Sequence, residues 1–135
     1  RGLAEPNPCI GCSARPCLDS CEPDVIRIHP SGHPLSGRAW LSFEESGCTF
    51  CGDCYEACPV AGPLPAGPPA PVGLAILSRE RCIAWDGVVC LSCNIACTWQ
   101  AISLDGKRRP SVREADCTGC GFCIPVCPTQ AISVS

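Results

Sequence analysis

Cysteine limits what this chain can fold into more than any other residue, because 16 of its 135 residues are cysteine. The sixteen divide into four groups of four with none left over, and we number these quartets one to four in chain order. They are Cys9, Cys12, Cys17 and Cys21; Cys48, Cys51, Cys54 and Cys58; Cys82, Cys90, Cys93 and Cys97; and Cys117, Cys120, Cys123 and Cys127. The grouping predicts a fold in which sulfur atoms gather in fours.

Quartets two and four share the spacing C-x2-C-x2-C-x3-C-P, which ends at Pro59 and Pro128. Bacterial ferredoxins bind [4Fe–4S] clusters with this run. Disulfide scaffolds do not repeat such closely spaced cysteines with a proline behind them, and zinc sites made of paired C-x2-C knuckles would leave the third and fourth cysteines unexplained. The pattern therefore predicts four [4Fe–4S] clusters, with zinc and disulfides as the weaker alternatives.

The fourth cysteine of each run decides which thiolates share a cluster, because in two-cluster ferredoxins it ligates the other cluster. This rule predicts four sets: Cys9, Cys12, Cys17 and Cys58 for cluster one; Cys48, Cys51, Cys54 and Cys21 for cluster two; Cys82, Cys90, Cys93 and Cys127 for cluster three; and Cys117, Cys120, Cys123 and Cys97 for cluster four. A nested arrangement, which pairs quartet one with four and quartet two with three, is the alternative.

The segments between the quartets predict small strands and two modules. Alternating and β-prone residues predict strands at 25–28, 38–43, 73–78, 101–104, 110–113 and 131–134. Residues 101–113 would form a hairpin that turns at Asp105-Gly106, and six prolines within residues 59–73 suit a semi-rigid connector. We therefore expect an α+β fold of tandem bacterial 2×[4Fe–4S] ferredoxin-like modules, with short helices and small antiparallel hairpins around the clusters. The modules would span 1–62 and 72–135, joined by a Pro/Gly-rich connector at 63–71, and the hairpins and connector favour tandem over nested pairing.

An internal repeat supports the second module. Residues 97–102 read CTWQAI and residues 127–132 read CPTQAI. Each copy predicts a fourth ligand, a turn and the start of a strand, as in the two halves of a pseudo-symmetric ferredoxin. Quartet one departs from the usual run, because four residues separate Cys12 from Cys17, and its loop is expected to be distorted.

The composition bounds the function. A short chain with 15 prolines and 13 glycines has a thin core, so we expect the clusters to fill the interior and their assembly to be coupled to folding. The net charge of −3, made more negative by bound clusters, disfavours nucleic acid and favours a basic docking face on a protein partner. The basic triplet Lys107–Arg109 is either a solvated turn or a tip that contacts an acidic patch on that partner.

Several other features have a plain interpretation. The sequence contains no run of about 18 apolar residues, so we expect no membrane span. It also contains no acid–base pair, nucleophile arrangement or phosphate-binding loop, so we expect no enzyme. The chain has no methionine, so we expect residues upstream of Arg1. His29 and His33 suit a solvated turn better than a metal site. Trp40, Trp85 and Trp99 suit a hydrophobic cover over the clusters better than an electron relay.

The chain resembles the NapF-type ferredoxin-like proteins of the periplasmic nitrate reductase system. The likeness covers nearly the whole chain and rests on four quartets in this order, on the seven residues between Cys82 and Cys90, and on prolines that directly follow only quartets two and four. Residues 51–59 (CGDCYEACP) and the Glu22-Pro23 pair also fit. The four-residue gap before Cys17 departs from the family, which usually has two residues there.

The resemblance implies a cytoplasmic iron–sulfur protein that carries electrons and is not itself an enzyme. Its implied partner is the molybdenum-containing catalytic subunit of nitrate reductase before export, and its implied role is to aid maturation of that subunit or insertion of the subunit's own cluster. The alternative is a permanent electron-transfer subunit of another oxidoreductase, of the formate dehydrogenase or hydrogenase type.

Overall fold

The fold consists of short helices and two-stranded sheets, divided between two compact units. The computed structural model describes residues 9, 11–60 and 70–135. The described residues up to Ser42, together with those from Cys51 to 60, belong to unit 1; Phe43–Phe50 and the residues from 70 onward belong to unit 2. Most of the predicted connector at 63–71 lies outside the described residues. None of the helices in the described ranges is long and apolar enough to cross a membrane.

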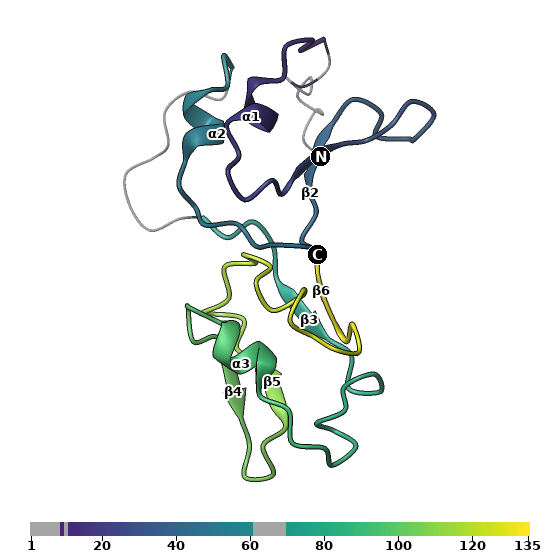
Figure 1. The fold of residues 1–135 in the computed structure, drawn as a ribbon, viewed down its shortest axis with the longest axis vertical. Helices are drawn as coiled ribbons and strands as arrows, with labels where there is room; N and C mark the ends of the chain where they lie inside the picture. The colour runs from purple at the N-terminus through teal and green to yellow at the C-terminus, as the bar shows by residue number, and fades with distance from the viewer. Residues whose placement is uncertain (1–8, 10, 61–69) are drawn as a thin grey trace, which may run out of the picture. The chain divides into compact units, whose positions relative to one another are not determined.

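Unit 1 contains one strand pair and two short helices. Strand β1 (Ile26–Ile28) pairs antiparallel with β2 (Ala39–Leu41), which confirms the strands predicted at 25–28 and 38–43. Helices α1 (Pro16–Asp19) and α2 (Asp53–Glu56) lie side by side (Figure 1). Proline suits the first position of α1, because the N–H that it lacks would have no partner within the helix. The extra residues of quartet one thus lead directly into a helix.

Unit 2 contains two strand pairs and one helix. Strand β3 (Ala75–Leu77) pairs with β6 (Ile132–Val134), and β4 (Ile102–Leu104) pairs with β5 (Pro110–Val112), both antiparallel. Helix α3 (Ser92–Ala96) packs on β4 (Figure 1). All four strands predicted for this part of the chain are confirmed. The outer two pair with each other and the inner two form a hairpin, as expected of two related halves.

The β4–β5 hairpin turns differently from the prediction. Leu104 pairs with Pro110, so the loop is longer than a two-residue turn at Asp105-Gly106. The left-handed residue in the loop is Arg108, with φ 61. The Asp105 carboxylate accepts the backbone N–H of Lys107 at 2.8 Å and of Arg109 at 2.9 Å, and the Nε–H of Arg109 at 2.7 Å. The prediction was wrong because the carboxylate, rather than glycine, organises the loop; these bonds, led by those from Arg109, lower the pKa of Asp105 to about 2.

The turn after the fourth cysteine is common to three quartets. Asp24, Gln100 and Gln130 each lie three residues beyond that cysteine, with φ of 50, 52 and 50. Each donates its N–H to the carbonyl of the cysteine, at 2.9, 3.0 and 3.2 Å, and a strand begins two residues later. The repeat predicted at 97–102 and 127–132 is confirmed. Its third copy, residues 21–26, is not visible in the sequence because Glu-Pro-Asp replaces the residues that end in glutamine.

Cysteines contribute to the core of unit 2. The buried Ala75, Ile102 and Ile132 pack with Cys93 and Cys123. A second cluster joins Cys82 to Ala84 and Ala131. Sulfur atoms therefore occupy positions that aliphatic side chains hold in an ordinary domain, in agreement with the thin core expected from the composition.

Residues 43–50 belong with the second half of the chain, although the predicted first module, 1–62, contains them. Phe43 is buried, and a Cβ at Gly121 would collide with its ring. A Cβ at Gly47 would lie 2.6 Å from the Phe122 ring, and the Cys48 N–H donates to the Cys120 carbonyl at 2.6 Å. The two predicted modules stay a prediction, and the units differ from them in this segment.

Candidate metal centres

Three pockets of the described structure are each lined by four cysteines, and we name them after their first quartet member. The Cys9 pocket is lined by Cys9, Cys12, Cys17 and Cys58; the Cys82 pocket by Cys82, Cys90, Cys93 and Cys127; and the Cys117 pocket by Cys97, Cys117, Cys120 and Cys123. They hold about 370, 300 and 330 Å³ of space between atoms, part of it open to solvent. With similar sizes and identical donors, the three could hold the same kind of group.

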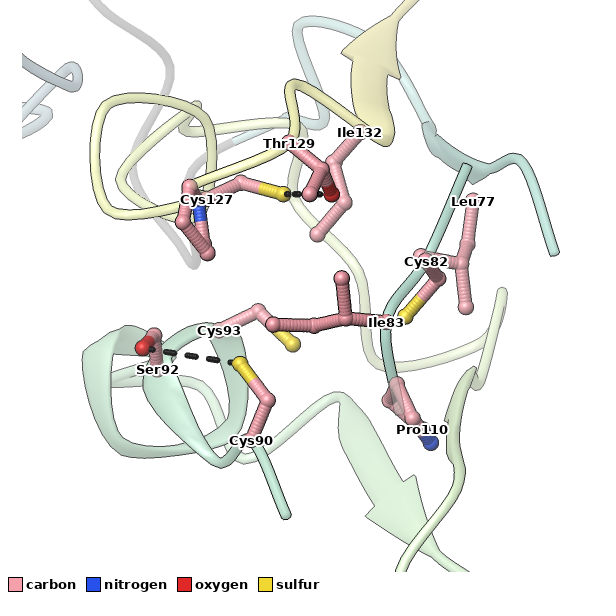
Figure 2. A pocket seen from close by; sticks show the side chains of 11 residues that line it. Leu77, Cys82, Ile83, Cys90, Ser92, Cys93, Pro110, Cys127, Thr129 and Ile132 are labelled. Carbon is pink, nitrogen blue, oxygen red and sulfur yellow. Dashed lines mark hydrogen bonds between the residues drawn. The ribbon is translucent and has the colours of Figure 1, made fainter. Parts of the chain in front are cut away.

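Each pocket combines three cysteines of one quartet with one cysteine of another. Figure 2 shows this for the Cys82 pocket, where Cys127 approaches from a separate stretch of chain to face Cys90 and Cys93. These are the combinations that the crossing rule predicts for clusters one, three and four. Of the set predicted for cluster two, Cys48 belongs to unit 2, whereas Cys21, Cys51 and Cys54 belong to unit 1.

Short helices direct neighbouring cysteines into different pockets. Helix α3 carries Cys93, and Cys97 follows directly after its last residue. Cys93 lines the Cys82 pocket and Cys97 lines the Cys117 pocket. One helical turn is thus enough to separate the third from the fourth cysteine of a quartet, which explains why the x3 spacing accompanies the crossing.

Left-handed residues shape the loops of quartets two and four. Phe50 and Gly52 have φ of 57 and 92, and the corresponding Gly119 and Gly121 have φ of 70 and 84. Alternation of right- and left-handed residues turns successive N–H groups to one side and forms a concave nest, a backbone arrangement found at phosphate and Fe–S sites. At Phe50 a non-glycine residue adopts this conformation, so the loop geometry is imposed by its surroundings.

Backbone N–H groups point at the cysteine sulfurs. Ala101 N–H donates to Cys97 Sγ and Ala131 N–H to Cys127 Sγ, both at 3.2 Å. Ala75 N–H donates to Cys117 Sγ at 3.4 Å. Such bonds favour a thiolate over a thiol, and they raise the potential of a cluster bound to that sulfur. The two alanines are the residues of the QAI repeat, so the repeat encodes the same donor twice.

The ionisation of the thiols reflects how closely they are grouped. The pKa of Cys93 is raised to about 11, mainly by burial and next by the nearby Cys82, Cys90 and Cys127. Burial, and next Cys120, raise the pKa of Cys123 to about 12.

Two further thiols are shifted in opposite directions. Burial, and in smaller measure Cys58, Cys9 and Cys12, raise the pKa of Cys17. Burial opposes ionisation of Cys127 as well, but the backbone N–H groups of Ala131 and Thr129 outweigh it and lower the pKa of that thiol. A metal cation that binds such thiols displaces their protons to solvent, because thiolates are the ligands of iron.

Hydroxyl groups accompany the sulfurs unequally. In the Cys82 pocket, Ser92 Oγ lies 3.8 Å from Cys90 Sγ, and Thr129 Oγ1 lies 3.9 Å from Cys127 Sγ (Figure 2). Thr118, which lines the Cys117 pocket, has a buried Oγ1 with no hydrogen-bond partner within the described residues. The four thiolates, the N–H donors and this hydroxyl fit a [4Fe–4S] cluster. Sequence reasoning missed Ser92, Thr118 and Thr129, whose only signal was their place next to cysteines or two residues away.

Trp85 anchors the loop inserted between Cys82 and Cys90. Its Nε1–H donates to the Pro110 carbonyl at 3.2 Å, and its side chain packs against the buried cluster of Cys82, Ala84 and Ala131. The guanidinium groups of Arg79 and Arg109 lie 4.4 and 4.5 Å from the ring centroid. Trp85 thus packs beside a cysteine of the Cys82 pocket without lining the pocket, and the cover interpretation stays a prediction. The basic triplet does not act as one group, because Arg109 is held by the ring and by Asp105, which leaves Lys107 and Arg108 exposed.

The other aromatic and histidine side chains differ in their relation to the pockets. Trp99 lines the Cys117 pocket and contacts Phe50 edge-on at 6.1 Å. Trp40 instead stacks on His29, so the cover interpretation does not extend to it. The rings of His29 and His33 are parallel at 4.1 Å, and His33 Nδ1 accepts the Leu35 N–H. Within residues 9, 11–60 and 70–135, no group of three or more His, Cys, Asp or Glu side chains could hold a single metal ion.

Both halves of the chain match models of iron–sulfur families. Residues 8–61 match one family and residues 75–134 match another, and each is described as a 4Fe-4S dicluster domain. Two dicluster domains therefore follow each other in this chain, and each contains two complete quartets.

Relatives resemble the chain over most of its length. It is 30% identical over 129 residues to the ferredoxin-type protein NapF of Escherichia coli K12, which covers 93% of this chain and 74% of that protein. The methylamine utilization ferredoxin-type protein MauM of Methylorubrum extorquens is 30% identical over 136 residues, with coverage of 88% and 60%. The ferredoxin-type protein NapG of Escherichia coli K12 is 28% identical over 138 residues, with coverage of 88% and 59%.

Proposed function

Because the chain belongs to the NapF-type ferredoxin family, we propose that this iron–sulfur electron-transfer protein binds four [4Fe–4S] clusters through the crossed cysteine sets. The ligands are Cys9, Cys12, Cys17 and Cys58; Cys48, Cys51, Cys54 and Cys21; Cys82, Cys90, Cys93 and Cys127; and Cys117, Cys120, Cys123 and Cys97. A bound [4Fe–4S] cluster supplies one-electron transfer at a potential tuned by its surroundings.

The observation that carries the proposal is the crossing of one cysteine into each of three pockets. Cys127, Cys97 and Cys58 each join three cysteines of a different quartet. Two-cluster ferredoxins have this arrangement, whereas four independent zinc knuckles would keep each quartet to itself. The backbone N–H groups of Ala101 and Ala131 would then stabilise thiolate ligands, and Trp85 and Trp99 would limit the access of water.

The physiological setting is the second part of the proposal. NapF and NapG are named as ferredoxin-type proteins, and the resemblance to the NapF family supports a cytoplasmic accessory or maturation factor for the catalytic subunit of periplasmic nitrate reductase. The alternative is a permanent electron-transfer subunit of another oxidoreductase. The likeness to the methylamine utilization protein MauM, also at 30% identity, favours keeping this second candidate.

Anaerobic reconstitution followed by iron and sulfide analysis tests the cofactor content. Four clusters correspond to about sixteen irons and about sixteen sulfides per chain. About twelve of each would mean that one set is not loaded. Bound zinc without visible thiolate-to-iron absorption would refute the proposal.

Co-purification separates the two settings. A permanent subunit stays with the mature enzyme at a fixed ratio, whereas a maturation factor binds the immature catalytic subunit and leaves it afterwards. Pull-down of the chain from cells that contain either the unexported or the mature nitrate reductase subunit therefore decides between them. Equal recovery of both forms would contradict the maturation role.

A further inference from the structure

Thr118 stands apart from the other polar side chains of the described structure. Its Oγ1 is the one buried side-chain oxygen or nitrogen without a hydrogen-bond partner among the described residues. A buried hydroxyl left without a partner costs about 1–3 kcal/mol, so an orphan of this kind calls for an explanation. The residue lies between Cys117 and Cys120 and lines the pocket that these two cysteines share with Cys97 and Cys123.

The backbone around Thr118 is already occupied. The Thr118 carbonyl accepts the N–H of Val72 at 2.9 Å. The next residue, Gly119, is pressed so closely against the backbone of Gly73 that a Cβ there would overlap it. These contacts fix the backbone of the loop at Thr118, and the residue lies at the wall of the pocket.

In the neighbouring pocket, two hydroxyls lie within hydrogen-bond reach of cysteine sulfurs. Thr129 Oγ1 lies 3.9 Å from Cys127 Sγ, and Ser92 Oγ lies 3.8 Å from Cys90 Sγ. Among the residues that the structure describes, no sulfur is a hydrogen-bond partner of Thr118 Oγ1. The acceptor that would satisfy it is therefore a group that occupies the pocket, and the cysteine donor set makes that group a [4Fe–4S] cluster.

We propose that the Thr118 hydroxyl donates a hydrogen bond to a sulfur of the cluster in the Cys117 pocket and raises the reduction potential of that cluster. This inference rests on the proposed cluster binding. Reduction adds one electron to the cluster and makes it more negative, so a donor to its sulfur stabilises the reduced form more than the oxidised form. No proton is transferred, because the hydroxyl keeps its hydrogen in both states.

Thr118→Val is the primary test, because valine preserves the β-branched shape and removes the hydroxyl. A net hydrogen bond of about 0.5–1.5 kcal/mol predicts a change of up to about tenfold in the ratio of reduced to oxidised cluster, which is about 59 mV for one electron. The potential of the Cys117-pocket cluster should become more negative by up to this amount. It is measured by EPR-monitored titration with dithionite, in which each cluster takes up one electron.

Two controls make the result specific. Thr118→Ser keeps the hydroxyl and should leave the potential near that of the native protein. Thr129→Val removes a hydroxyl from the Cys82 pocket and should shift only the cluster in that pocket. An unchanged potential in Thr118→Val, or an equal shift in Thr118→Ser and Thr118→Val, would overturn the proposal.

Thr118→Ala is a second test if no cluster binds in the Cys117 pocket of the valine variant. If the Val and Ala variants both lose that cluster and the Ser variant retains it, the hydroxyl contact is supported, because only threonine and serine of these four residues carry a hydroxyl. Loss in all three variants overturns it, because packing of the threonine methyl group would then be the requirement. Iron content of the native protein decides separately whether clusters bind at all, so failure of this inference and failure of the cofactor proposal are distinguishable.

Discussion

The Cys82 and Cys117 pockets have the same sulfur donors and different surroundings. The Cys82 pocket has hydroxyls beside two of its cysteines, and the Trp85 ring, which packs against the cluster that contains Cys82, contacts two guanidinium groups. The loop of the Cys117 pocket is closely packed instead: the Gly119 backbone lies against the Gly73 backbone, and the Gly121 backbone lies against the Phe43 side chain. Hydroxyls next to the sulfurs and guanidinium groups at Trp85 thus distinguish the first pocket, and close packing at two glycines distinguishes the second.

This difference indicates that the spacing of the ligands and the environment of the cluster are separate properties of the chain. Both pockets have two buried cysteines, Cys82 and Cys93 in one, Cys120 and Cys123 in the other. Burial of the ligands therefore does not distinguish them. Hydrogen bonds and nearby charge do, and these set the potential of an iron–sulfur cluster.

Replacing the crossing cysteine of each pocket in turn should have the largest effect. Cys127→Ser should abolish or damage the cluster held by Cys82, Cys90 and Cys93, with a loss of up to about four irons per chain, and should spare the cluster in the Cys117 pocket. Cys97→Ser is the matched control and should have the reverse effect. Iron analysis and EPR of the reduced proteins measure both. If Cys127→Ser empties the Cys117 pocket instead, each quartet serves its own cluster and the crossed assignment is wrong.

The second prediction tests the packed backbone of the Cys117 pocket. Gly119→Ala places a Cβ against the Gly73 backbone and forces a left-handed conformation that costs about 1–2 kcal/mol by itself. Gly87→Ala, in the loop of the Cys82 pocket, incurs a similar conformational cost at φ 90 but meets no atom within 4 Å. Gly119→Ala should therefore lose cluster absorbance faster under anaerobic chelator challenge than Gly87→Ala. Equal rates would show that the contact with Gly73 is not a constraint.

The third prediction sharpens the electrostatic side of the comparison. A cation near a cluster stabilises its reduced, more negative form, so the Cys82-pocket cluster should have the more positive potential of the two. Arg79→Gln removes one of the two charges at the Trp85 ring and should lower that potential by a modest amount, because exposed charges are screened by salt. Lys107→Gln removes the same charge from the hairpin loop without touching the ring and should shift it less. EPR-monitored titrations in which the Cys117-pocket cluster moved instead would contradict this.

The smallest expected effect concerns docking. Since Arg109 is held by Asp105 and Trp85, only Lys107 and Arg108 of the basic triplet are free to meet an acidic partner. Lys107→Glu with Arg108→Glu should lower the association rate for the unexported catalytic subunit more than it changes the dissociation rate. Surface plasmon resonance at low and physiological salt measures both rates. An unchanged association rate would return the two residues to an ordinary solvated loop.

The cysteine sets of three pockets and all the strands of the described structure could be predicted from the sequence. The spacing of the quartets predicted which cysteines line the Cys9, Cys82 and Cys117 pockets, and β-prone segments predicted all six strands. The crossing of the fourth cysteine came from the ferredoxin pattern. The strands and the spacing within a quartet depend on residues close together in sequence, where chain stiffness and side-chain alternation dictate the geometry. The repeat at residues 97–102 and 127–132 was visible for the same reason. Its third copy at residues 21–26 was hidden, because aspartate and glutamine can both adopt the left-handed turn.

The sequence alone predicted quartets of cysteines, the crossing of a fourth cysteine, which three pockets show, and short strands between the quartets. Three features depend on the tertiary structure: residues 43–50 pack with the second half of the chain, Arg109 contacts the Trp85 ring, and the Thr118 hydroxyl has no hydrogen-bond partner within the described residues. The physical reason is the distance along the chain between the groups that interact. A quartet's spacing is set by the few bonds between its cysteines, whereas packing, cation–π contacts and the satisfaction of a buried hydroxyl depend on atoms that the chain brings together from distant positions.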